Sequence, residues 1–262
     1  KSGGVFEWSA RALHSLVYCY ENEGDEKYKK LANAAIRKNI VYIDEAGGIR
    51  ALVSSMKNHS SEAIAQMWVM KLLWRLQDRE EESATRRVIQ KMCDEHVVQA
   101  LVKVLKGRST TPAVYEYTAS LMFNVLAGSR NQNIPDEAGD CLRKTLRMMT
   151  EHPNNESLQE ACCRLLSGLA SSCRLQIKED NGLTTVISAM SKFPTNLELQ
   201  EACGWILWTM SYIPAFFDYA ILTKAFDSLK VSLQTHTEAV TLMTCVCGMI
   251  ANVVLSNNTN FK

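Results

Sequence analysis

Apolar residues recur at helical spacing along most of the chain, and short polar or glycine-containing segments separate the runs. This spacing places the apolar side chains on one face of an α-helix. The clearest run covers residues 199–211, LQEACGWILWTMS. The same opening, LQEAC, begins residues 158–170, which lie 41 positions earlier, and the apolar spacing after it is kept. A recurrence near forty residues in a helical sequence predicts a stack of helical repeats.

Further copies of this pattern extend the prediction to the whole chain. A short helix is expected to end at Gly47 and Gly48, because glycine accepts the positive φ of a helix end, and a second apolar helix follows at once. A long third helix then completes each copy. The predicted third helices are 7–17, 62–76, 112–126, 156–170, 197–211 and 238–255. The predicted units of one domain, 1–262, are a partial 1–20, then 21–77, 78–127, 128–170, 171–211 and 212–262.

These copies resemble the armadillo repeat. Residues 45–53, EAGGIRALV, and 179–187, EDNGLTTVI, are similar to the turn between that family's first and second helices. The long third helices are similar to its inner helix, and the resemblance covers nearly the whole chain. It implies an all-α fold, a right-handed α-solenoid of three-helix repeats. HEAT repeats are the main alternative, and the short helix before each glycine turn favours armadillo.

The start of the chain departs from this regular pattern. The first copy is incomplete and the sequence begins at Lys1, so we expect a fragment of a longer protein. An acidic segment, 21–26, and the following residues 27–36 together lengthen the first connection by roughly a helix of four turns. An insertion of this kind lies on the surface of a solenoid. A functional role and simple tolerance both remain open for it.

Composition narrows the environment and the partners. The net charge of +1 disfavours nucleic-acid binding, which needs clustered positive potential. Most of the nine cysteines fall in apolar runs, where a free thiol acts as a small core residue. We therefore expect reduced thiols and a cytoplasmic location, with a nuclear one also possible. No apolar run reaches the roughly 18 residues that a membrane-spanning helix needs.

The sequence contains no recognisable catalytic constellation. Nucleophile-elbow, phosphate-loop and zinc-protease motifs are absent, and the histidines are scattered. Cys162 and Cys163, like Cys245 and Cys247, lack the partner spacing of a metal site, so packing thiols are expected. We predict no enzyme activity, no metal and no cofactor. Methionine and tryptophan at helical spacing are expected in the core, and this group comprises Met67, Trp68, Met70, Trp74 and Trp208.

The LQEAC alignment sets which positions of each third helix face outward. Outward positions repeat at i, i+4 and i+8 and are polar, small or amphipathic, whereas the flanking columns are apolar. This outward column reads Glu7, Arg11, Ser15; Met67, Lys71, Arg75; Glu116, Ser120, Asn124; Glu160, Arg164, Gly168; Glu201, Trp205, Thr209; and Thr244, Gly248, Asn252. The residues proposed to bind a partner are Trp205, Arg164, Lys71, Arg75, Asn124, Glu116, Glu160, Glu201, Thr209 and Asn252.

In the nuclear-import adaptors of the armadillo family, this column carries a Trp-x-x-x-Asn pair in successive repeats. Here Trp205 is the only tryptophan in its column and Thr209 stands in the asparagine position, so import-cargo binding is not expected. The column contains both acidic and basic residues, and Lys71 and Arg75 give its N-terminal half a positive charge. The expected function is a non-catalytic module that binds a protein or peptide on the concave surface. A structural or regulatory segment of a larger multidomain protein is the alternative.

Overall fold

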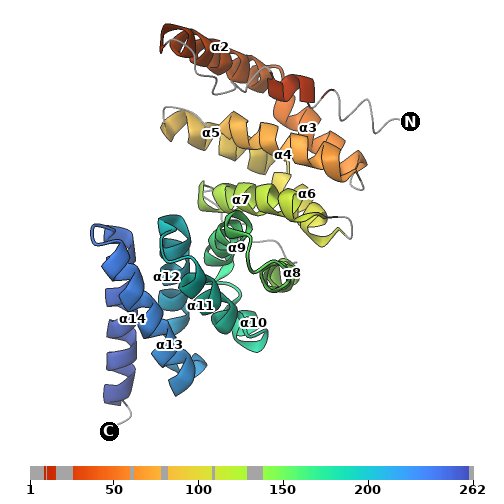
Figure 1. Ribbon diagram of the computed structural model, residues 1–262. Coiled ribbons are helices and arrows are strands. Elements are labelled where there is room, and N and C mark those ends of the chain that lie inside the picture. Colours follow the sequence, from red (N-terminus) through yellow and green to blue (C-terminus); the bar gives the residue numbers. More distant parts are fainter. Residues whose placement is uncertain are drawn as a thin grey trace. The chain divides into compact units, whose positions relative to one another are not determined.

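Every secondary-structure element of the described chain is helical. The computed structural model describes residues 9, 11–15, 26–59, 62–77, 82–107, 110–128 and 138–259, and no strand occurs among them (Figure 1). The predicted all-α class is therefore confirmed. Contacts divide the chain into two compact units, residues 1–135 and 136–262. The assignment of residues 1–262 to one domain stays a prediction.

The first unit contains two successive groups of three helices after a helical segment at residues 11–15. The third helix of the first group, α4, packs directly against the third helix of the second, α7 (Figure 1). The bounds are α2 (Glu26–Glu45), α3 (Gly48–Asn58), α4 (Ala63–Gln77), α5 (Glu82–Asp94), α6 (Val97–Lys106) and α7 (Pro112–Gly128).

The segment 27–36 forms the front part of α2 rather than a separate insertion helix. No glycine or proline interrupts residues 26–45, so nothing ends the helix before Glu45. Ile36 and Ile40 are both buried, and their spacing of four places them on one face of α2. The extra residues therefore lengthen the first helix of the repeat.

The second unit continues the same succession. Its third helices α9, α12 and α14 lie side by side, with α12 packed against both others (Figure 1). In the last repeat a 3-10 turn, η1, begins at Pro214. The bounds are α8 (Ala138–Glu151), α9 (Glu156–Leu169), α10 (Arg174–Glu179), α11 (Gly182–Lys192), α12 (Leu197–Ser211), η1 (Pro214–Phe216), α13 (Tyr219–Thr235) and α14 (Val240–Thr259).

A left-handed residue ends the turn before the second helix in three of the repeats. Gly47 has φ 77°, His96 has φ 59° and Asn181 has φ 55°. They stand immediately before α3, α6 and α11. Glycine adopts this conformation without steric cost, and asparagine and histidine are enriched there among the other residues. The chain thus reverses at matching positions of these three repeats, and the turn predicted at Gly47 is one of them.

A buried glutamine joins the second and third helices in three repeats, and we call this arrangement the carbonyl latch. The Nε2 of Gln159 donates to Met149 O at 2.8 Å and to His152 O at 3.0 Å. Gln66 and Gln200 make equivalent pairs of bonds. In the repeat of α6 and α7, the Thr110 hydroxyl, just before α7, lies within hydrogen-bond distance of Val104 O at 2.7 Å and of Gly107 O at 3.0 Å. One carbonyl of each glutamine pair also accepts a backbone N–H, as His152 O does from Asn155. The latch therefore supplies a donor chiefly to the other carbonyl, such as Met149 O, near the end of the second helix.

The third helices bury most of their surface, and small thiols fill part of the core. Met70 is fully buried, as predicted. Cys163 on α9 and Cys203 on α12 bring their Sγ atoms to 3.5 Å of each other, and both are buried free thiols. Burial raises the pKa of Cys203 well above its usual range, and it raises that of Cys245 to about 11. Cys247 is exposed.

Candidate functional site

In the first unit, the outward column of the third helices is accessible to solvent. Arg11 and Ser15 are exposed, and the column members on α4 and α7 are all partly exposed. Neighbouring positions on α4, such as Leu72 and Leu73, are fully buried. Glu7 lies outside the described residues. The α4 members are Met67, Lys71 and Arg75, and the α7 members are Glu116, Ser120 and Asn124.

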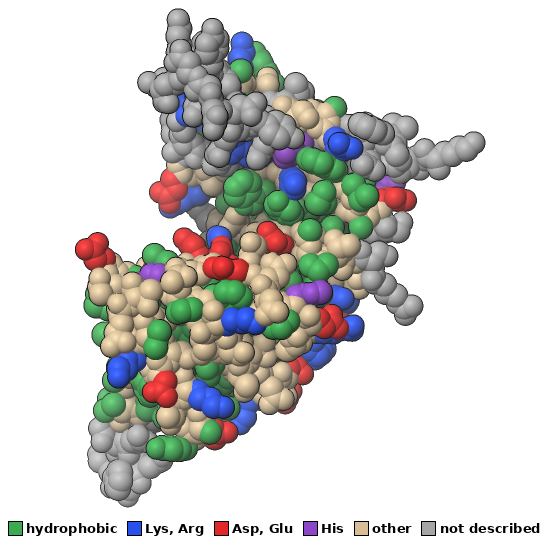
Figure 2. All heavy atoms as spheres, in the orientation of Figure 1, with side chains coloured by type: hydrophobic (Ala, Val, Ile, Leu, Met, Phe, Trp, Pro, Cys, Tyr) green, Lys and Arg blue, Asp and Glu red, His purple; other side chains and the backbone are tan. Residues whose placement is uncertain are grey.

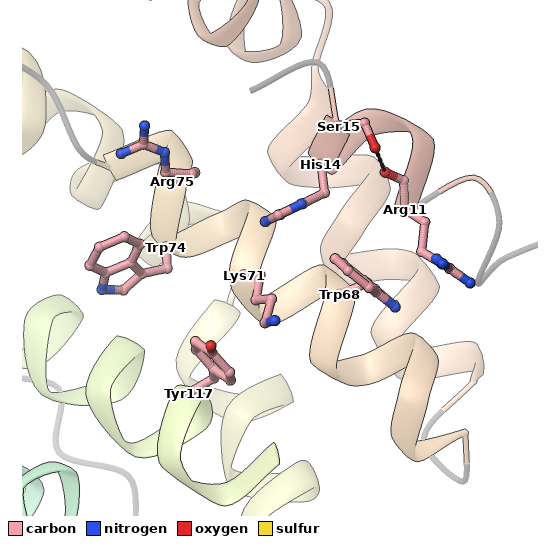
Figure 3. Close-up of a pocket in the computed structure, with 8 residues that line it drawn as sticks. All are labelled: Arg11, His14, Ser15, Trp68, Lys71, Trp74, Arg75 and Tyr117. Carbon is pink, nitrogen blue, oxygen red and sulfur yellow. Dashed lines mark hydrogen bonds between the residues drawn. The ribbon is translucent and has the colours of Figure 1, made fainter. Parts of the chain in front are cut away.

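Four of these outward residues meet in a pocket of about 430 Å³ (Figure 3). The helical segment 11–15, α4 and α7 all contribute to the lining. The lining residues are Arg11, His14, Ser15, Trp68, Lys71, Trp74, Arg75 and Tyr117. Figure 2 shows hydrophobic side chains gathered over α4 and α7, with lysine or arginine side chains among them. The pocket therefore combines cations with aromatic rings.

Lys71 lies at the centre of this arrangement. Its Nζ is 4.9 Å from the centroid of the Trp68 ring and 5.0 Å from that of Tyr117, so one ammonium contacts rings on both α4 and α7. The guanidinium of Arg11 lies 5.4 Å from the same Trp68 ring. Contacts of this kind contribute roughly 0.5–2 kcal/mol each, depending on how far the cation is desolvated. They hold two positive charges beside one indole.

His14 adds a neutral imidazole to the pocket. The side chain is 9% exposed and packs edge-on against Trp68, with ring centroids 5.0 Å apart. Burial lowers the pKa of His14, and the positive charges of Lys71 and Arg75 lower it further. The imidazole is therefore uncharged at neutral pH. The charge of the described lining comes from Arg11, Lys71 and Arg75, with no carboxylate among them.

Trp74 corrects the expectation that the tryptophans of α4 lie in the core. Its side chain is 41% exposed at the edge of the pocket, and Trp68 is partly exposed. Trp74 follows Lys71 by three positions, and residues at this spacing share one face of a helix. Its position next to the outward column in the sequence could have indicated that Trp74 is exposed. The spacing of Trp68 and Tyr117 alone did not indicate that they flank a lysine.

The outward column of the second unit presents an aromatic cluster on α12. Trp205 is 45% exposed and packs edge-on against Trp208, with ring centroids 5.2 Å apart. Trp208 in turn stacks with Tyr212 at 6.5 Å. Trp208 is partly exposed rather than fully in the core, and it lies against Gly248 of α14, which has no side chain to exclude it. Trp205 therefore rests on a second ring.

Several polar members of this column already have partners within the chain. Arg164 lies 3.7 Å from Glu160, and Asn196 donates to Glu160 at 3.1 Å. Asn252 donates to the hydroxyl of Ser211 at 3.0 Å. Thr209 is only 7% exposed and offers little surface to a partner, because α12 is packed between α9 and α14. The remaining members, Glu201, Gly168, Thr244 and Gly248, are partly or fully exposed.

No protein-family model matches this sequence, and no curated protein matches it. Within the part of the chain that the structure describes, no group of three or more metal-ligating side chains could hold a metal ion. None of the described helices is long and apolar enough to cross a membrane. The functional interpretation is therefore based on the side chains of the outward column and of the pocket.

Proposed function

We propose that this chain is a protein-interaction module of the armadillo type. In this proposal the repeats form a right-handed α-solenoid, and the third helices line a concave surface that holds a peptide or a folded partner. The supporting observation is the exposure pattern of the third helices, which pack side by side within each unit and leave most of the described outward column accessible. The left-handed turns and the carbonyl latches, which recur at matching positions, also support a repeat of this kind.

Trp205 is the proposed anchor for the partner. An indole that is accessible on one face and supported on the other supplies contact area at low entropic cost, and tryptophan is enriched among residues that dominate interface energy. Trp208 provides that support. Arg164, Lys71 and Arg75 would donate charge-assisted hydrogen bonds to acidic groups of the partner. The mixed charge of the column would then select the partner's orientation.

Affinity capture from a cell extract, quantified by mass spectrometry, tests this proposal. Trp205→Ala should deplete a defined set of bound proteins by about tenfold or more, since loss of an anchor residue costs about 2 kcal/mol or more. Arg164→Glu should deplete the same set. Tyr219→Ala is the matched control, because Tyr219 is an 86% exposed aromatic residue on α13, outside the outward column.

The purified partner is then titrated against each variant, and circular dichroism checks that the variants are folded. Retention of every partner by both Trp205→Ala and Arg164→Glu would refute the proposed surface. Equal depletion by Tyr219→Ala would also count against it, since that residue lies on a different helix.

A further inference from the structure

An uncharged apolar stripe runs along the exposed face of α14, which follows α13 in the second unit (Figure 1). Its members are separated by three and four residues in alternation, and all are exposed to solvent. No Asp, Glu, Lys or Arg occurs from residue 239 to 261, whereas every other α-helix of the described chain contains at least one. A helix face that stays in water is normally polar or charged. The stripe comprises Val240, Met243, Cys247, Ile250 and Val254.

In the preceding third helices, the central part of this face is covered by the next third helix. The repeat alignment matches Cys247 with Gly204 of α12 and with Cys163 of α9. Cys163 lies against Cys203 of α12, and a methyl group on Gly204 would lie 3.2 Å from Leu242 of α14. The matches of the next two stripe residues are likewise buried, namely Leu207 and Ser211 on α12 and Leu166 and Ala170 on α9. The exposed face of α14 is therefore the one that α9 and α12 use to bind a further helix.

We propose that this chain forms a symmetric dimer in which the stripes of two α14 helices pack against each other. Apolar residues at alternating spacings of three and four form one seam, so two such helices contact each other along their length. Because the stripe has no charge, two copies bring no like charges together and bury no charge without a partner. Among the described α-helices, only α14 combines exposed apolar side chains with this lack of charge. A second copy of the chain therefore presents the same uncharged seam.

The size of the stripe limits the strength of the dimer. Helix α14 has 20 residues and is about 30 Å long, so one pair of such helices buries less than the roughly 800 Å² per partner of a standard interface. We therefore expect a dissociation constant of about 1–100 μM. In more dilute solution the monomer predominates, and Cys247 is then accessible to thiol reagents.

The stripe is separate from the outward column. Thr244 and Gly248, which belong to the column, each follow a stripe residue by one position, and one position rotates a side chain by about 100° around the helix. The dimer therefore uses a different face of α14. Trp205→Ala, which removes the proposed anchor for a partner, should leave dimerisation unchanged.

Sedimentation velocity of the full chain, at concentrations below and above the expected dissociation constant, tests the inference. The wild-type chain should pass from monomer to dimer as its concentration rises. Cys247 is the middle member of the stripe, so the two Cys247 side chains lie near each other whichever way the helices run. Cys247→Glu and Cys247→Lys should each weaken the dimer at least about tenfold, because like charges then meet within the seam. An equimolar mixture of the two variants should recover the dimer, which a folding defect would not do.

Chemical cross-linking provides a second measurement. A short bis-maleimide should join two wild-type chains through Cys247, and Cys247→Ser should give no covalent dimer. Leu175→Glu is the matched control, because Leu175 is an exposed apolar residue on α10, in the preceding repeat. This variant should dimerise as the wild-type chain does.

A chain that stays monomeric at every concentration would overturn the inference. A dimer that both charged Cys247 variants retain, or that Leu175→Glu weakens equally, would also refute it. Protection of Cys247 from a thiol reagent only after addition of cell extract would instead indicate a different protein partner, and protection only by phosphatidylcholine vesicles would indicate a membrane surface. The sedimentation and cross-linking samples contain no other protein, so their outcome is separate from that of the proposed interaction module.

Discussion

Replacement of Gln159 by methionine measures what one carbonyl latch contributes to stability. Methionine keeps the length and approximate volume of the side chain but removes the amide that donates to Met149 O and His152 O. Gln159 is 3% exposed, so water cannot readily replace the amide. The Met149 carbonyl has no backbone alternative, because the residue four positions later is Pro153, which lacks an N–H group.

The expected loss of stability follows from these contacts. Each hydrogen bond contributes about 0.5–1.5 kcal/mol net, and a buried acceptor left without a donor costs roughly 1–3 kcal/mol. Burial of the methionine offsets part of this loss. We therefore expect Gln159→Met to lower the free energy of unfolding by about 2–4 kcal/mol. With a urea m-value of about 2 kcal/mol/M, the midpoint should fall by about 1–2 M.

Urea unfolding followed by far-UV circular dichroism provides the measurement. Gln234→Met is the control, because Gln234 is exposed on α13 and its replacement should change stability by less than about 0.5 kcal/mol. A loss below about 1 kcal/mol in Gln159→Met would show that the carbonyls find other partners. An equal loss in Gln234→Met would assign the effect to the substitution itself rather than to the latch.

Two further predictions concern the second unit, one on helix packing and one on thiol reactivity. In Gly248→Ala the new methyl group overlaps the Nε1 of Trp208, so we expect a loss of about 1–3 kcal/mol in urea unfolding. Gly139→Ala, whose nearest neighbour is Gln176 Cγ at 3.8 Å, should not destabilise the protein, and a similar loss there would contradict the packing explanation. Cys247 is exposed and should react with a thiol reagent in the native protein, whereas Cys245 is buried with a pKa raised to about 11. Cys247→Ser should remove one equivalent of fast-reacting thiol and Cys245→Ser none, and the reverse result would refute this assignment.

The helices of the repeats were predictable because their signal is local. The predicted third helices 62–76, 112–126 and 156–170 agree closely with α4, α7 and α9, since apolar periodicity and nearby turn residues define them. The glycine turn at Gly47 was predicted for the same reason. The continuity of α2 was missed because alignment to the repeat placed a boundary where the sequence has no helix-breaking residue.

The sequence predicted the cationic residues of the pocket but not its aromatic residues. The register of the third helices placed Arg11, Lys71 and Arg75 on the outward face, and the structure brings them together in one pocket. The aromatic contribution of Trp74 was missed, because an indole at helical spacing produces the same pattern whether it packs inward or lies at a rim. Only the neighbouring helix decides between these positions. Thr209 is the opposite case. It was predicted to face outward, but its polar side chain is buried by helices that are remote in the sequence.

The carbonyl latch also bears on how such a chain can change its length. Each latch connects residues no more than ten positions apart, and both ends belong to the same repeat. Gain or loss of a whole repeat therefore leaves the latches of all other repeats intact. The shared LQEAC segments at 158 and 199 both contain the latch glutamine, and each of these two glutamines follows a proline by six positions. A duplicated repeat would contain its own latch glutamine and the carbonyls that it bonds. The number of repeats can therefore increase without leaving these buried carbonyls without a donor.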